Sequence, residues 1–142
     1  MQIAAGNNPA AKNALQFLHQ YKKDPARLEI VNAEVLSNLA EAKLTAQEIQ
    51  EQNIKDNALL KIVGHEATLN LADAKITAQQ IQDQWIKDRA LLNIVIVEAL
   101  TDPEAARITS EFIQRPLCKV LAYLEIGKNH MLKTLPRQKT LP

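Results

Sequence analysis

The strongest constraint on the fold is an internal repeat of 32 residues. The stretch LAEAKLTAQEIQEQNIKDNALLKIV, which starts at Leu39, is nearly copied by LADAKITAQQIQDQWIKDRALLNIV, which starts at Leu71. Aligning Asn38–Leu69 with Asn70–Thr101 gives roughly two-thirds identity, and several differences are conservative, such as Leu44/Ile76 and Glu51/Asp83. A fixed period of about 20 to 50 residues is typical of repeat proteins, in which each unit buries its apolar face against its neighbours.

The same period continues more faintly on both sides of the two central copies. Upstream, Lys23-Asp24 aligns with Lys55-Asp56, and downstream Ile108-Thr109 aligns with Ile76-Thr77. Outer copies are expected to diverge because one of their faces meets solvent instead of a neighbour. The sequence therefore predicts two clear central copies between two degenerate outer ones.

Composition and spacing predict that each copy is a pair of α-helices. Good helix formers dominate the chain, which has only three glycines. Thr45 is followed by Glu48 in a capping-box pattern, and Asp56 is a second candidate N-cap. We therefore expect a short helix at Ala46–Lys55 and a longer one at Asn57–Ala72. The equivalent capping residues in the other copies are Thr77 with Gln80, and Asp24 and Asp88.

The predicted fold is all-α, built of stacked antiparallel helical hairpins that form a short α-solenoid or a compact helical bundle. A single hairpin cannot bury its apolar stripe, so neighbouring copies must supply the rest of the core. We expect residues 1–131 to form one domain. Residues 132–142 contain Lys and Arg but no acid and include two prolines, so they are expected to be a basic, disordered tail.

Charge and motif content argue against several classes of function. The net charge of +1 lacks the strongly basic footprint of most nucleic-acid binders. His19, His65 and His130 occupy different positions of the repeat, and none has a second ligand at metal spacing. Cys118 aligns with apolar Ile54 and is expected to be a small buried hydrophobe. We expect no catalytic residue, metal site or cofactor.

Six residues are predicted to contact a partner protein. Trp85 and Tyr21 occupy equivalent positions, and exposed Trp and Tyr side chains are frequent interface anchors. The alternative is that Trp85 packs at a seam between copies. Amide side chains pair readily with peptide groups and carry no charge, which favours Gln50 and Gln82 as binding residues.

The remaining two candidates are acidic. Glu66 and Glu98 recur with Glu34 once in each long helix, so stacking would set them in a row that binds basic partners. The alternative is a set of solvated or locally paired glutamates. Gly64 stands where Asn32 and Ile96 stand in the neighbouring copies. This glycine is interpreted as one that allows a close helix contact or a bend, or as one that is merely tolerated.

The pattern N-L-A-x-A-K-[LI]-T-A-Q-x-I-Q, within residues 38–95, resembles short two-helix repeats of type IV-secreted effector proteins of intracellular bacteria. This resemblance implies a non-catalytic scaffold that is delivered into a host cell. The sequence contains no apolar run of membrane-spanning length and no Sec-type signal peptide. We therefore expect a cytoplasmic location, or secretion into a host cell by a non-Sec route.

The function predicted from these features is a non-catalytic protein–protein interaction module, with another protein as the partner and a homodimer left open. One alternative is a small enzyme or enzyme inhibitor with a pocket between hairpins. The other is a weak nucleic-acid binder that uses the helix pairs and the basic tail.

Overall fold

The all-α prediction is confirmed by the computed structural model, which describes residues 4–134. These residues form eight α-helices and one short 3-10 helix, without a strand. In chain order the elements are α1 (Ala4–Ala14), η1 (Leu15–Phe17), α2 (Gln20–Ser37), α3 (Leu39–Glu48), α4 (Gln52–Leu69), α5 (Leu71–Gln79), α6 (Gln84–Thr101), α7 (Pro103–Ser110) and α8 (Pro116–Thr134).

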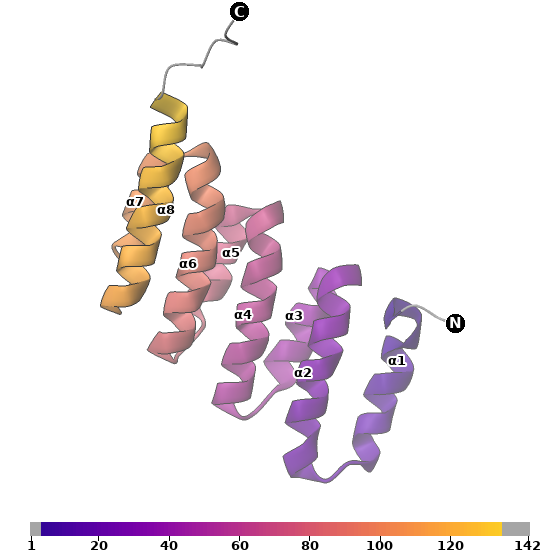
Figure 1. Ribbon diagram of the computed structural model, residues 1–142. Helices are drawn as coiled ribbons and strands as arrows, with labels where there is room; N and C mark the ends of the chain where they lie inside the picture. The colour runs from indigo at the N-terminus through magenta and orange to yellow at the C-terminus, as the bar shows by residue number, and fades with distance from the viewer. Residues whose placement is uncertain (1–3, 135–142) are drawn as a thin grey trace, which may run out of the picture.

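The helices form an open stack with two layers (Figure 1). The long helices α2, α4, α6 and α8 lie side by side in one layer, each packed against the next. The shorter helices α3, α5 and α7 lie behind them, and each packs against the long helix before it and the long helix after it. The N-terminal and C-terminal helices lie at opposite ends of the stack, so the described part of the chain is a short solenoid.

The sequence repeat is also a structural repeat. The helices α2, α4 and α6 each have 18 residues and begin 32 residues apart, at Gln20, Gln52 and Gln84. Equivalent apolar residues of the two central copies are fully or almost fully buried in one continuous core. On the long helices these are Ala58, Leu59, Ile62, Val63 and Ala67 in α4, and Ala90, Leu91, Ile94, Val95 and Ala99 in α6.

The helix boundaries differ from the expected ones. The short helix α3 begins at Leu39 rather than Ala46, and the long helix α4 begins at Gln52 rather than Asn57. The actual N-cap of α3 is Asn38, whose Oδ1 accepts a hydrogen bond from the Glu41 N–H at 3.2 Å. Asn70 caps α5 in the same way through the Asp73 N–H, also at 3.2 Å.

The predicted caps Thr45 and Thr77 are wrong because both residues lie inside a short helix, and the Thr45 hydroxyl has another role. Thr45 lies inside α3, fully buried, and donates a hydrogen bond to Glu34 Oε1 of α2 at 2.6 Å. Thr109 of α7 donates in the same way to Glu98 Oε1 of α6 at 2.7 Å. A hydroxyl that could cap a helix locally therefore joins a short helix to the long helix before it.

The predicted aspartate caps are wrong for a related reason. Asp56 lies within α4, almost completely buried, and accepts hydrogen bonds from the backbone N–H groups of Gln82 at 3.1 Å and Asp83 at 2.9 Å. These two residues precede the next long helix, α6. The same pair of bonds joins Asp24 to Gln50 and Glu51, and Asp88 to Gln114 and Arg115. Each aspartate therefore fixes the start of the following long helix instead of its own.

The C-terminal helix ends the array with altered residues. Cys118 is buried, as predicted. Val120 and His130 of α8 stand where Asp88 and Glu98 stand in α6, so α8 lacks both carboxylates that join one copy to the next. Helix α8 continues to Thr134, so residues 132–134 are helical rather than part of a disordered tail. Residues 135–142 of that predicted tail lie outside the described residues.

We predict that Asp56→Ala lowers the free energy of unfolding by about 3 kcal/mol, because two backbone N–H groups lose their acceptor. The control is Asp83→Ala, which removes the side-chain cap of α6 and is expected to cost about 1 kcal/mol. Urea denaturation of both variants measures the difference. An Asp56→Ala loss no larger than that of the control would show that the carboxylate does not link the copies.

The hydrogen bonds of the buried aspartates also predict that the protein loses folding stability in acid. Burial alone would raise the pKa of Asp24 and Asp88, but hydrogen bonds from backbone N–H groups and from Arg27 or Arg115 outweigh it and hold each pKa below the ordinary 3.8. The unfolded state then binds more protons than the folded state near that pH, so this stabilisation is full above about pH 4 and is lost as pH falls through the folded pKa. An Asp24→Asn/Asp88→Asn variant should be less stable at neutral pH. As the pH is lowered, its free energy of unfolding should fall less steeply than that of the unsubstituted protein. An equally steep fall in both proteins would contradict the role of these aspartates.

Candidate functional site

The predicted aromatic contacts lie at the beginning of the long helices. Tyr21 and Trp85 are the second residues of α2 and α6, and their side chains are 72% and 67% exposed. Leu117, at the equivalent position of α8, is also exposed. The guanidinium of Arg115 lies 4.0 Å from the centre of the Trp85 ring, so Trp85 contacts the next copy while leaving most of its surface in solvent.

The predicted glutamine contacts lie at the same edge. Gln50 and Gln82 are exposed and lie in the loops before α4 and α6. The Gln20 side chain, next to Tyr21, donates to Gln50 Oε1 at 3.4 Å. The structure therefore brings Tyr21, Gln50, Gln82 and Trp85 to one rim of the stack, which we call the helix-start edge.

The prediction of an exposed acidic row is wrong, because Glu66 and Glu98 are buried. The relative exposure of Glu66 is 1% and that of Glu98 is 4%. Lys43 of α3 forms an ion pair with Glu66. Lys75 of α5 forms one with Glu98 at 2.5 Å. These glutamates join each long helix to the short helix before it, so they are not available to a partner.

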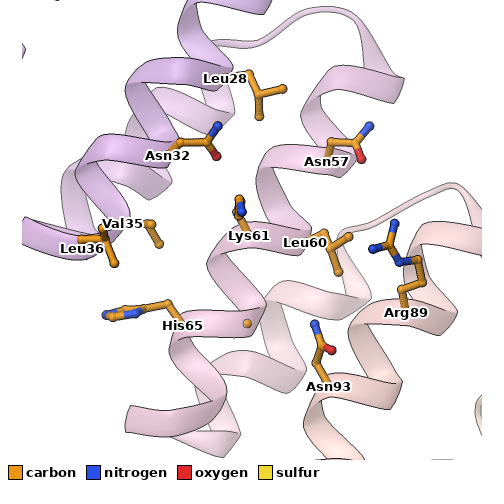
Figure 2. A pocket seen from close by; sticks show the side chains of 11 residues that line it. Leu28, Asn32, Val35, Leu36, Asn57, Leu60, Lys61, His65, Arg89 and Asn93 are labelled. Carbon is orange, nitrogen blue, oxygen red and sulfur yellow. The ribbon is translucent and has the colours of Figure 1, made fainter. Parts of the chain in front are cut away.

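The structure shows a groove on the outer face of the long-helix layer (Figure 2). Its volume is about 790 Å³, and its lining comes from α2, α4 and α6. Because α4 is the middle helix, it forms the floor, while α2 and α6 form the walls. None of these lining residues was among the six predicted contacts.

Gly64 deepens the groove above α4 because it has no side chain. The equivalent residues on α2 and α6 are Asn32 and Ile96, both of which carry side chains. A Cβ built at Gly64 would lie 3.8 Å from Asn93 Nδ2, an ordinary contact distance. Gly64 is therefore not required by a close helix contact, and its main structural effect is to leave space above α4.

The groove is cationic. Lys61 of α4 and Arg89 of α6 are exposed at its lining, and His65 lies on α4 about one turn after Lys61 (Figure 2). None of the groove-lining residues carries a carboxylate. No carboxylate among the described residues forms an ion pair with Lys61 or Arg89, in contrast to the paired Lys43 and Lys75.

Three asparagines, one from each helix, also line the groove. Asn32 comes from α2, Asn57 from α4 and Asn93 from α6, and Figure 2 shows their side-chain amides. Asn57 donates to the Asn53 carbonyl at 2.9 Å, which leaves its own carbonyl as an acceptor. Asn32 Oδ1 has no hydrogen-bond donor among the described residues. Amides with unused donors or acceptors can pair with peptide groups of a bound chain.

The remaining lining is apolar, mainly Leu28, Val35, Leu36 and Leu60. The groove therefore offers apolar, amide and cationic contacts, but its lining includes no carboxylate, thiol or hydroxyl that could act as a nucleophile or an acid–base pair. Within residues 4–134, no group of three or more His, Cys, Asp or Glu side chains is arranged to hold a metal ion. No helix in this described range is long and apolar enough to cross a membrane.

A second, smaller pocket lies between α3 and α5 on the other layer. Its volume is about 120 Å³, and it includes Lys43, Gln47, Ile76 and Gln80. Gln47 Nε2 donates to Gln80 Oε1 at 3.1 Å across the two short helices. The two successive short helices are therefore joined at their surface, and this pocket is too small for a peptide segment.

The sequence contained one signal for the groove, which is the break at Gly64 in an otherwise closely copied helix. Asn57 and Arg89 share one position of the repeat, and Lys61 and Asn93 share another. Their clustering with Asn32 was still not visible in sequence, because recurrence does not show which helix face stays open when three helices are stacked.

The chain matches no protein-family model, no curated protein sequence and no solved structure.

Proposed function

We propose that the protein is a non-catalytic scaffold that binds a segment of another protein in the groove across α2, α4 and α6. The observation that carries this proposal is the groove itself, which combines unpaired cations, amides and leucines on one face. Its volume of about 790 Å³ lies in the range of ordinary ligand sites, about 300 to 1,000 Å³.

The composition of the groove favours binding over the two alternatives. An enzyme or enzyme inhibitor with a pocket between hairpins would use several reactive groups that act together, whereas the groove lining offers Lys61 and His65 but no carboxylate, thiol or hydroxyl to act with them. A nucleic-acid binder would use more cations and exposed aromatic rings for base stacking. Lys61, His65 and Arg89 are accompanied by leucines rather than aromatic rings.

The resemblance to type IV-secreted effector repeats supports the same kind of role, because it implies a scaffold without catalysis. Delivery into a host cell by a non-Sec route is part of this proposal, and the cytoplasm of the producing cell is the other proposed location. The helix-start edge with Trp85 is a second candidate surface for the same function, since Trp85 and Tyr21 are exposed.

The test is a selection of random peptides, displayed on phage, against the immobilised protein. We expect enriched peptides whose binding is weakened at least about tenfold by Gly64→Ile, because the side chain fills the floor of the groove. Ile96 already occupies the equivalent position of α6, so the fold should accept this residue. Gly64→Ala is the matched control, because its methyl group has room beside Asn93 and leaves most of the groove open.

Thermal unfolding of each variant checks that any loss of binding is not a loss of fold. Peptides that lose binding in Trp85→Ala but not in Gly64→Ile would place the site at the helix-start edge and would contradict the groove. A selection that enriches no common peptide would contradict peptide binding altogether.

A further inference from the structure

We infer that the groove binds an extended peptide segment that carries Asp or Glu side chains beside apolar ones. This inference rests on the proposed function and adds the chemistry and the conformation of the ligand. Its basis is the combination of cations, asparagine amides and apolar residues that line the groove around α4.

The acidic character of the ligand follows from charge complementarity. Lys61 and Arg89 are exposed on adjacent helices, at the middle and one wall of the groove, and neither is neutralised by a described carboxylate. Arg27, Lys43, Lys75 and Arg107, by contrast, are all engaged in ion pairs within the chain. Cations left unpaired in a recess attract acidic partners and repel basic ones.

The extended conformation of the ligand is inferred from the asparagine side chains that line the groove. Asn32, Asn57 and Asn93 line the groove from the long helices α2, α4 and α6, and Asn57, whose amide nitrogen donates to the Asn53 carbonyl, keeps its own carbonyl as an acceptor. A helical ligand uses its own N–H and C=O groups internally, whereas an extended one leaves them free for such amides. Packed helices lie about 8 to 10 Å apart, so the path from α2 to α6 is about 20 Å, or about six extended residues.

The apolar side chains of the ligand are inferred from the leucines that line the groove. Leu28 and Leu36 of α2 and Leu60 of α4 line the same groove and can bury apolar side chains that alternate with the acidic ones, since successive residues of an extended chain point to opposite sides. The same leucines disfavour a phosphate backbone, which needs polar partners along its whole length. The groove lining therefore favours an acidic peptide over a nucleic acid.

The experiment compares three pools of synthetic peptides, each about ten residues long and about 33 Å when extended. Alternate positions are randomised among Leu, Ile, Val, Ser and Gly. The other positions are Asp or Glu in the first pool, Asn or Gln in the second, and Lys or Arg in the third. Binding is measured by fluorescence anisotropy at low and at high salt, with a ten-nucleotide poly(U) RNA as a fourth probe.

We expect the acidic pool to bind about tenfold more tightly than the amide pool, with an advantage that shrinks at high salt, and the basic pool not to bind. The variant Lys61→Glu/Arg89→Glu should reverse the order of the acidic and basic pools. The control Lys22→Glu/Lys128→Glu makes the same change of charge at two exposed residues outside the groove lining and should preserve the order.

Amide peptides that bind as tightly as acidic ones would overturn the acidic inference while leaving peptide binding intact. Poly(U) that binds more tightly than every peptide pool would overturn it in favour of a nucleic acid. Binding that survives with the same order in Lys61→Glu/Arg89→Glu would show that the peptide lies elsewhere. Failure of all three pools, with success of the phage selection, would overturn the inferred ligand chemistry alone.

Discussion

The structure depends on a buried aspartate that reaches from one copy of the repeat to the next. Asp24, Asp56 and Asp88 each accept two backbone N–H groups from the loop that begins the following long helix. A buried carboxylate is costly unless its oxygens are hydrogen-bonded, and these bonds can form only when the neighbouring copy is in register. The interaction therefore selects one relative position of successive helices, which apolar packing alone would specify less narrowly.

A second buried carboxylate acts at the other end of each long helix. Glu34, Glu66 and Glu98 pair with a lysine from the preceding helix, and Glu34 and Glu98 also accept a threonine hydroxyl from the following short helix. The aspartates thus join long helices through their loops, and the glutamates join the two layers. Because both ends of each long helix are bonded to neighbouring elements, the outer faces of α2, α4 and α6 are held side by side. The side chains on these faces are free to differ between copies.

The fold class and the repeat could be predicted from the sequence because they follow from periodicity and close copying. The helix boundaries could not, because the capping rules describe local bonds while Thr45 and Asp56 use their oxygens on other helices. The acidic row was misplaced for the same reason: recurrence showed that the glutamates are equivalent, but not whether they face solvent or the preceding helix. The groove was missed because Lys61, Arg89 and Asn32 become neighbours only after the copies are stacked.

The central claim is that the aspartate links fix the spacing of the long helices that carry the groove. The most direct measurement is the distance between spin labels at Ser37→Cys on α2 and Leu100→Cys on α6, both exposed, in a Cys118→Ala background. Double electron–electron resonance should give one narrow distance distribution, which broadens markedly when Asp56→Ala is added under conditions where the helices remain folded. A distribution that stays equally narrow in the Asp56→Ala variant would contradict the account.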